Sequence, residues 1–348
     1  MEMKKDTTES KMTTSSEPSM QQTILAYLVW NGSFVFFACF NLGLIVFSFY
    51  IFSTRTIMVG LIYVGFLVVV PSGGLGCHLK DGLPWRSFSE KYYFPGTVMR
   101  SYLNLQITKP PPSFIKAEAQ PDAQFILACF PHGCGSEFRI LMEGMNQSVM
   151  PNIVGKQNKL RTLAASILFM IPCIREIALW TGCIDANRKT ASNALDNGRS
   201  LLILPGGEAE QILTTYGQER IYLQSRKGFL KLAMRKNVPV VPVYVFGSSD
   251  LFYTSTAFAT PRKWIQKKFG ICLPICYGLW GSFCPLPKTI TIVFGSPLTF
   301  QMKGNNNNDG PTEDELNNAH TQFCTELITL FDLHKERVGY GDRKLEIL

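Results

Sequence analysis

The sequence predicts a mixed α/β domain with a largely parallel sheet, preceded by an N-terminal hydrophobic membrane segment. Beyond residue 73, short apolar runs alternate with helical stretches, and Gly or Pro ends each run. Strands that alternate with helices typically form a parallel sheet with helices packed on it. The membrane segment is predicted because residues 23–52 are almost continuously apolar.

The N-terminal part divides into a tail and a membrane segment. Residues 1–22 are rich in Thr, Ser, Glu and Lys and predict a disordered polar tail. The apolar run 23–52 is longer than the about 20 residues that a spanning helix needs. It also exceeds the hydrophobic core of a signal peptide, which has about 7–15 residues. A second apolar run, 57–70, follows after four polar residues and ends at Pro71.

Two arrangements of these apolar runs compete. One is a hairpin over residues 23–72 that returns to the side from which it entered. The other is a single span followed by an interfacial helix, because residues 57–70 are short for a full span. The brief polar break favours the hairpin. The positive-inside tendency places the remaining domain, residues 73–348, on the cytosolic side in both arrangements.

The charge of the chain is concentrated in the predicted domain. Residues 1–72 contain four basic and four acidic residues, so the net charge of +8 lies in residues 73–348. A basic domain beside a membrane favours anionic lipid surfaces or anionic molecules such as CoA. Zinc-finger spacing, RNA-binding aromatic motifs and long Lys/Arg runs are absent from the sequence, which disfavours nucleic acid as a partner.

The ten cysteines do not suggest a disulfide framework. Several lie in apolar runs, and we expect reduced thiols that are buried or face the cytosol. Cys272 and Cys276 have ligand-like spacing but no matching second pair. We therefore expect no metal and no organic cofactor.

Several elements of the domain can be placed by pattern. The predicted strands are 125–130, 201–204, 240–246 and 289–294. A basic helix is predicted over 225–236, and Thr312 with Glu315 forms a capping box that opens a helix to about Arg337. The apolar stretches 163–180 and 269–287 either line an acyl tunnel or membrane interface, or belong to the core; the pattern leaves both open.

His132 stands out among the four histidines. It follows a predicted strand, and ligands of parallel sheets bind where the strands end. Its ordinary pKa near about 6.5 suits a general base. Glu137 lies five residues later, and if a helix began at Gly133 the carboxylate would hold the imidazole, as in triad chemistry. His78, His320 and His334 are expected to have packing or solvated roles.

Five sequence blocks resemble the diacylglycerol acyltransferase type 2 family, which includes monoacylglycerol and wax-alcohol acyltransferases. They are Tyr93-Phe94-Pro95, Phe130-Pro131-His132-Gly133, Gly206-Gly207-Glu208-Ala209-Glu210, Arg226 to Ala233 and Val241 to Gly247. Their order and spacing agree with the family over residues 92–300. The resemblance implies a glycerolipid-acyltransferase-like sheet with flanking helices. One difference is Phe130, where the family often has His.

The resemblance implies acyl transfer from acyl-CoA to a lipid hydroxyl. His132 is then the base, oriented by Glu137 as our own hypothesis, and Glu210 is a further catalytic candidate that binds the acceptor hydroxyl. Backbone N–H groups around Gly133 or Gly206-Gly207 are candidate donors to the oxyanion. Cys134 is a rival nucleophile.

Three basic residues are predicted to contact the substrates together with Pro131 and the glycines. Arg226 and Lys227 are expected to meet the CoA phosphates, with a solvated helix face as the alternative. Arg188 is predicted either to pair with the carboxylates of Glu208 and Glu210 or to contact substrate.

The expected activity is the synthesis of triacylglycerol from diacylglycerol and acyl-CoA. Monoacylglycerol or a long-chain alcohol is the alternative acceptor, because acceptor choice depends on pocket shape. A non-catalytic lipid-binding protein of the same fold is a further alternative, prompted by Phe130. The expected location is the endoplasmic reticulum membrane, with the domain facing the cytosol, and lipid droplets.

Overall fold

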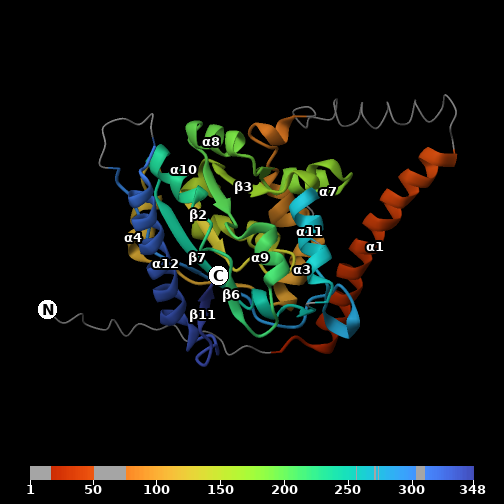
Figure 1. The fold of residues 1–348 in the computed structure, drawn as a ribbon. Coiled ribbons are helices and arrows are strands. Elements are labelled where there is room, and N and C mark those ends of the chain that lie inside the picture. Colours follow the sequence, from red (N-terminus) through yellow and green to blue (C-terminus); the bar gives the residue numbers. More distant parts are fainter. Residues whose placement is uncertain (1–16, 51–75, 256, 270–271, 273, 303–309) are drawn as a thin grey trace.

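A seven-stranded sheet organises the chain, in the order β1-β10-β7-β2-β5-β3-β4 (Figure 1). The structure is a computed structural model that describes residues 17–50, 76–255, 257–269, 272, 274–302 and 310–348. The strands are β1 (Gln106–Ile107), β2 (Ile126–Phe130), β3 (Leu160–Ala164), β4 (Cys183–Asp185), β5 (Ser200–Ile203), β7 (Val240–Phe246) and β10 (Thr291–Phe294). All neighbours pair in parallel except β10 with β7.

Helices cover both faces of this sheet. They are α3 (Phe94–Tyr102), α4 (Pro112–Glu118), α5 (Glu137–Glu143), α6 (Asn146–Val149), α7 (Ile174–Trp180), α8 (Arg188–Asp196), α9 (Gly207–Leu213), α10 (Gly228–Lys236), α11 (Ala259–Phe269) and α12 (Glu313–Lys335). Two small sheets complete the fold. One pairs β6 (Glu219–Ile221) with β11 (Leu345–Ile347), and the other pairs β8 (Tyr253–Thr254) with β9 (Cys276–Tyr277).

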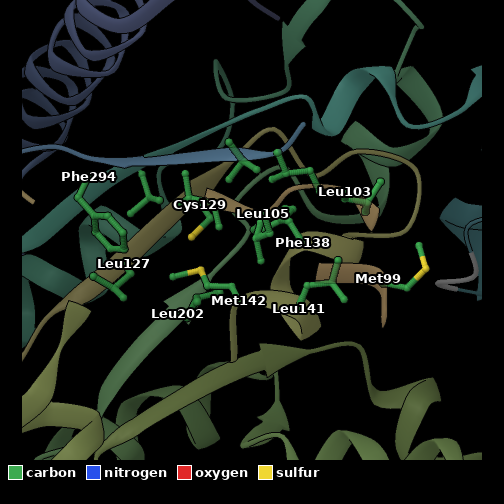
Figure 2. Close-up of a cluster of buried hydrophobic side chains, with 14 of the residues drawn as sticks. Met99, Leu103, Leu105, Leu127, Cys129, Phe138, Leu141, Met142, Leu202 and Phe294 are labelled. Atoms are coloured by element: carbon green, nitrogen blue, oxygen red, sulfur yellow. The ribbon is translucent and has the colours of Figure 1, made fainter. Parts of the chain in front are cut away.

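The core has two halves because successive side chains of a strand point to opposite faces. On β2, Leu127 and Cys129 pack with side chains of α3, α4 and α5, and Figure 2 shows them beside Phe138 and Met142. The alternate residues of β2 pack with α8, α10 and α12, and Phe130 lies 6.2 Å from Phe323 between ring centroids. Burial on both faces explains why these strands read as unbroken apolar runs.

The predicted elements are confirmed with small shifts at their ends. The four predicted strands correspond to β2, β5, β7 and β10, and the basic helix corresponds to α10. The capping box is formed: Glu315 N–H donates to Thr312 Oγ1 at 3.3 Å, and Thr312 N–H donates to Glu315 Oε2 at 2.8 Å. Strands β1, β3, β4, β6, β8, β9 and β11 were not predicted, and each has five residues or fewer.

Helix α1 (Met20–Tyr50) is long and apolar enough over Met20–Gly43 to cross a membrane. Few residues of this segment are buried against the rest of the protein. Ala26 and Trp30 are buried against the body, while the far end extends away from it (Figure 1). The second apolar run, 57–70, lies outside the described residues. The predicted hairpin is therefore not shown, and the described part of the N-terminal region contains one apolar helix.

Part of the apolar stretch 269–287 lies alongside α1. The ring of Tyr27 is 4.9 Å from that of Trp280, and the ring of Phe34 is 5.4 Å from that of Phe283. Trp280 and Phe283 remain 62% and 61% exposed. The exposed aromatic side chains therefore favour the interface interpretation of this stretch, although Cys284 within it is buried. The stretch 163–180 contains both buried and exposed apolar side chains, since Phe169 is buried and Met170 is 75% exposed.

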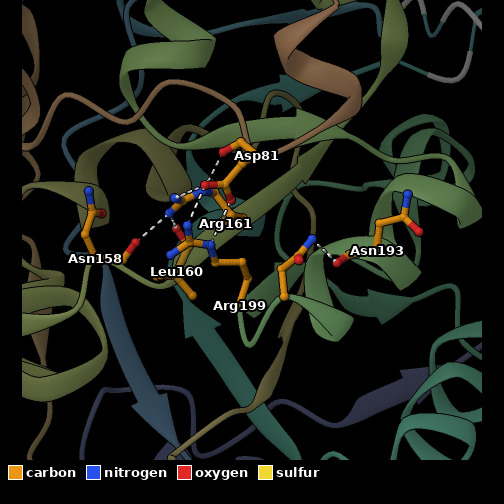
Figure 3. Close-up of polar contacts among 7 residues, drawn as sticks. Asp81, Asn158, Leu160, Arg161, Asn193 and Arg199 are labelled. Atoms are coloured by element: carbon orange, nitrogen blue, oxygen red, sulfur yellow. Dashed lines mark hydrogen bonds and ion pairs between the residues drawn. The ribbon is translucent and has the colours of Figure 1, made fainter. Parts of the chain in front are cut away.

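An ion cluster ties the segment after the apolar region to the sheet. Asp81 pairs with Arg161 on β3 at 3.1 Å and with Arg199, just before β5, at 2.6 Å (Figure 3). Both arginines lie where these strands begin, at the edge opposite to the carboxyl ends of the strands. We therefore assign this cluster a structural role.

A second polar network holds the C-terminal segment against the sheet. Arg343 Nη1 lies 2.8 Å from Glu219 Oε1 and 2.9 Å from Asp250 Oδ2. Tyr244 donates to Glu219 at 2.5 Å, and Tyr340 donates to Asp250 at 2.8 Å. Both carboxylates are almost fully buried. Burial raises the pKa of Glu219, and Arg343 supplies the charge that compensates the buried carboxylates.

We expect Arg343→Met to destabilise the protein by about 3 kcal/mol, because the variant leaves two buried carboxylates without their cation. Arg220→Met is the control, since Arg220 pairs with Glu346 at the surface of the same strand pair. Its expected loss is under about 1 kcal/mol. Unfolding of the detergent-solubilised protein measures both, and equal losses would contradict the role of the buried network.

Candidate active site

Three loops meet where the central strands end. Strands β5, β2 and β7 are parallel neighbours, so their carboxyl ends lie at one edge of the sheet. His132 follows β2, the Gly206-Gly207 pair follows β5, and Ser248 follows β7. The arrangement brings together sequence blocks that are up to 117 residues apart, as numbered from Pro131 to Ser248. It matches the edge at which parallel sheets bind ligands.

The His132 imidazole is half-buried at this edge. Its Nδ1 lies 3.3 Å from the Gly133 carbonyl oxygen, and its ring makes no other hydrogen bond among the described residues. We assign the proton to Nδ1 as the donor in this contact, which leaves a lone pair on Nε2. Burial lowers the pKa of His132 from 6.5 to about 4. The imidazole is therefore neutral near pH 7 and able to accept a proton.

Glu210 on α9 holds the main chain that carries His132. Its carboxylate accepts the backbone N–H of His132 through Oε1 and the backbone N–H of Tyr222, at 2.8 Å, through Oε2. Glu210 is only 1% exposed, and burial raises its pKa to about 7. Both carboxylate oxygens bind backbone amides, so Glu210 holds the His132 main chain in this arrangement, and its contact with the acceptor hydroxyl stays a prediction.

Two positions of this site require glycine, because neighbouring atoms leave no room for a Cβ. A Cβ on Gly206 would lie 2.1 Å from Glu210 Oε2, so a side chain there would displace the carboxylate. Gly133 has φ +68°, a left-handed conformation, and a Cβ there would lie 2.5 Å from Ser248 Oγ. Pro131 is buried beside them. The glycines thus let three chain segments pack at van der Waals distance.

Glu137 lies close to the site but does not hold His132. Helix α5 begins at Glu137 and not at Gly133, so the predicted helical geometry for the pair is wrong. No hydrogen bond joins the two side chains in the described part of the chain, and the Gly133 carbonyl makes the contact to the ring instead. Glu137 Oε2 is buried and has no hydrogen-bond partner among the residues that the structure describes. A role for Glu137 in catalysis stays a prediction.

Burial raises the pKa of Glu137 from 4.5 to about 7. The folded protein therefore holds this proton to higher pH than the unfolded chain. Its contribution to stability is present below the unfolded pKa and is lost as pH rises through about 7. We expect Glu137→Gln, which cannot ionise, to match the wild-type Tm near about pH 5 and to exceed it near about pH 8.

Thermal unfolding at both pH values tests this prediction. Glu326→Gln serves as the control, because Glu326 is exposed on α12. We expect that variant to differ little from wild type at either pH. A Tm difference for Glu137→Gln that does not change with pH would contradict the buried-carboxyl explanation.

The predicted substrate-binding cations lie at different distances from the site. Arg226 packs over the Tyr222 ring at 5.0 Å and donates to the Gly206 carbonyl oxygen at 3.4 Å, and its Nε is buried without a partner. Lys227 donates to Asn317 Oδ1 at 2.6 Å. Arg188 is exposed at the start of α8, after the edge strand β4, and makes none of the ion pairs in the described residues. Of these three cations, Arg226 is the one with a hydrogen bond to the glycine block in the described structure.

Cys134 is a poor candidate nucleophile. It is buried, and a hydrogen bond with Cys276 followed by burial raises the pKa of its thiol well above the ordinary value. The thiol therefore stays protonated near pH 7, and the thiolate is the nucleophilic form. Gln211 donates to the Cys134 backbone carbonyl, which gives the residue a structural contact. No group of three or more His, Cys, Asp or Glu side chains suited to a metal lies among the described residues.

The other histidines have packing contacts. His320 Nε2 lies 3.0 Å from the Leu223 carbonyl oxygen, and His78 stacks on Phe169 at 4.7 Å. His334 Nδ1 lies 3.2 Å from Arg337 Nη2. Two components of the site were missed in the sequence: the Tyr222 amide and Ser248. Ser248 could have been found, because it follows a predicted strand by two residues, whereas nothing local marks the Tyr222 amide.

Curated proteins similar to this chain include diacylglycerol O-acyltransferase 1 of Eremothecium gossypii, 30% identical over 271 residues. That match covers 74% of this chain and 56% of the relative, so it spans just over half of the relative's length. Human diacylglycerol O-acyltransferase 2 is 28% identical over 95% of this chain and 83% of its own. Human 2-acylglycerol O-acyltransferase 3 is 32% identical over 69% of this chain and 71% of its own length.

The family model described as diacylglycerol acyltransferase matches residues 98–348. This range contains the sheet, the His132 loop, the Gly206-Gly207 block and the strand that leads to Ser248. It covers more than half of the chain, and the sequence resemblance to the family is thereby confirmed. On this match, together with the relatives above, the chain belongs to the diacylglycerol acyltransferase type 2 family.

Proposed function

We propose that this protein is a membrane-anchored O-acyltransferase that moves an acyl group from acyl-CoA onto diacylglycerol and forms triacylglycerol. The observation that carries the proposal is His132, a neutral imidazole with an unused Nε2 at the ligand-binding edge of the sheet. The chain also belongs to a family whose relatives are named for acylglycerol acyl transfer. No organic cofactor or metal enters the proposed reaction.

The reaction needs a base because a lipid hydroxyl is a poor nucleophile. His132 Nε2 takes the hydroxyl proton while the oxygen attacks the thioester carbon. The new C–O bond forms, the C–S bond breaks, and the CoA thiolate leaves. The imidazolium then returns its proton to that thiolate. Glu210 contributes by holding the His132 main chain, which keeps the imidazole at the edge of the sheet.

Acyl-CoA would lie over the Gly206-Gly207 block. Arg226 lies beside this block with a buried Nε that lacks a partner, so it can bind a phosphate of CoA. Lys227 is a second phosphate contact once its bond to Asn317 opens. Arg188, exposed near the same edge of the sheet, is a more distant contact for the donor.

The lipid acceptor would enter from the membrane. Helix α1 and the exposed rings of Trp280 and Phe283 form one apolar surface, and aromatic rings favour the membrane interface. Seating this surface in the bilayer brings the acceptor hydroxyl to the active site without exposing its acyl chains to water. We place the protein in the endoplasmic reticulum membrane and on lipid droplets, with the sheet domain in the cytosol.

The acceptor is tested with microsomes from cells that lack their own neutral-lipid acyltransferases. Labelled oleoyl-CoA is supplied with diacylglycerol, monoacylglycerol or hexadecanol. We expect labelled triacylglycerol. Labelled diacylglycerol or wax ester as the main product would replace the proposed acceptor and keep the reaction. Absence of any product would overturn the enzyme assignment in favour of a lipid-binding protein.

A further inference from the structure

Ser248 is a buried hydroxyl that the structure leaves without a partner. The residue is 2% exposed, and its Oγ makes no hydrogen bond with any residue that the structure describes. A buried polar group without a partner costs about 1–3 kcal/mol of stability. Such an atom past the carboxyl end of a parallel strand, where ligands bind, is explained when its partner arrives with the ligand.

The Ser248 hydroxyl lies next to the loop that carries His132, the proposed base. Ser248 begins the turn after β7, which pairs in parallel with β2, so both residues lie past the ends of neighbouring strands. A Cβ added to Gly133 would lie 2.5 Å from Ser248 Oγ and 3.2 Å from the Ser248 carbonyl oxygen. The hydroxyl therefore contacts the backbone of the residue that follows His132.

The chemistry of the substrates decides what this hydroxyl binds. The hydroxyl of the acceptor gives its proton to His132, so it already has its hydrogen-bond partner. The thioester carbonyl oxygen gains negative charge as the new bond forms, and it needs a donor. A serine O–H is a donor.

The backbone donors that the sequence predicted are only partly available. The Gly207 N–H donates to the Leu204 carbonyl oxygen at 3.0 Å, so it is committed within its own loop. The His132 N–H is committed to Glu210. These two bonds remove two backbone donors from the site, and a side-chain donor can act beside the backbone donors that remain.

We propose that the Ser248 hydroxyl donates a hydrogen bond to the thioester carbonyl oxygen as it becomes an oxyanion. Ser248 gains and loses no covalent bond: the proton of the acceptor passes to His132, the C–O bond forms, and CoA leaves as the thiolate. This inference rests on the proposed acyl transfer and adds the donor that stabilises its charged intermediate.

The test compares Ser248→Ala, Ser248→Cys and Ser249→Ala. Ser249 is a buried serine on the same turn and provides the matched control. We expect kcat to fall roughly 10²-fold in both Ser248 variants, since each loses a strong donor. KM for acyl-CoA should change little, and Ser249→Ala should keep the wild-type rate. The cysteine variant separates the loss of the donor from the loss of volume.

A second measurement reports whether the site is intact. An acyl-CoA thioether, which lacks the carbonyl oxygen, should inhibit wild type and Ser248→Ala with the same inhibition constant. Wild-type kcat in Ser248→Ala, recovery of the rate in Ser248→Cys, or weaker thioether binding that matches the rate loss would each overturn the inference. Wild-type protein that forms no product would instead overturn the proposed function, and the inference with it.

Discussion

His132→Ala should abolish acyl transfer while the protein still folds and binds membranes. General-base catalysis contributes about 10²–10⁴-fold to a rate, and the variant removes the whole contribution. Cavity costs should be small, because the His132 ring is half-buried and, among the described residues, hydrogen-bonds only to the neighbouring Gly133 carbonyl. Labelled triacylglycerol formed at matched expression is the measurement.

Two control variants sharpen this experiment. His334→Ala removes a histidine from α12, and Cys134→Ala removes the rival nucleophile. We expect both to retain activity. Transfer that survives in His132→Ala would show that another group takes the proton, and loss in Cys134→Ala alone would point to an acyl-enzyme route.

Glu210→Gln should be almost as damaging as Glu210→Ala. Both oxygens of Glu210 accept backbone N–H groups, from His132 and from Tyr222. A glutamine amide has one oxygen and one NH₂, so it would place a donor against one of these donors. A buried N–H left unpaired costs about 1–3 kcal/mol. When this cost displaces His132, a fall in kcat of roughly 10- to 100-fold is expected.

Glu208→Gln is the matched control, because Glu208 lies on the same helix and makes no hydrogen bond to the His132 loop. We expect its kcat to stay near wild type. The two variants should also differ in Tm, since only Glu210→Gln disturbs buried backbone amides. A Glu210→Gln enzyme with wild-type kcat and Tm would show that the carboxylate does not position His132.

Much of the fold follows from local pattern. The strands that became β2, β5, β7 and β10 are predictable because both faces of these strands are buried, which selects unbroken apolar runs. The short strands β6 and β11 carry no such signal. Strand β6 includes the buried Glu219, whose charge is compensated by Arg343 from the C-terminal segment. A residue 124 positions away cannot be inferred from the sequence around Glu219.

The sequence by itself determined the family, the N-terminal apolar helix and the strand-end position of His132. Each of these depends on residues that are close in the chain or on motifs that can be matched directly. Only the tertiary structure decided what the carboxylates do. Glu210 reaches the His132 amide across 78 positions, whereas Glu137, five positions away, makes no bond to the ring. The physical reason is that parallel strands bring distant loops to one edge of the sheet, and side-chain hydrogen bonds there depend on strand order and register.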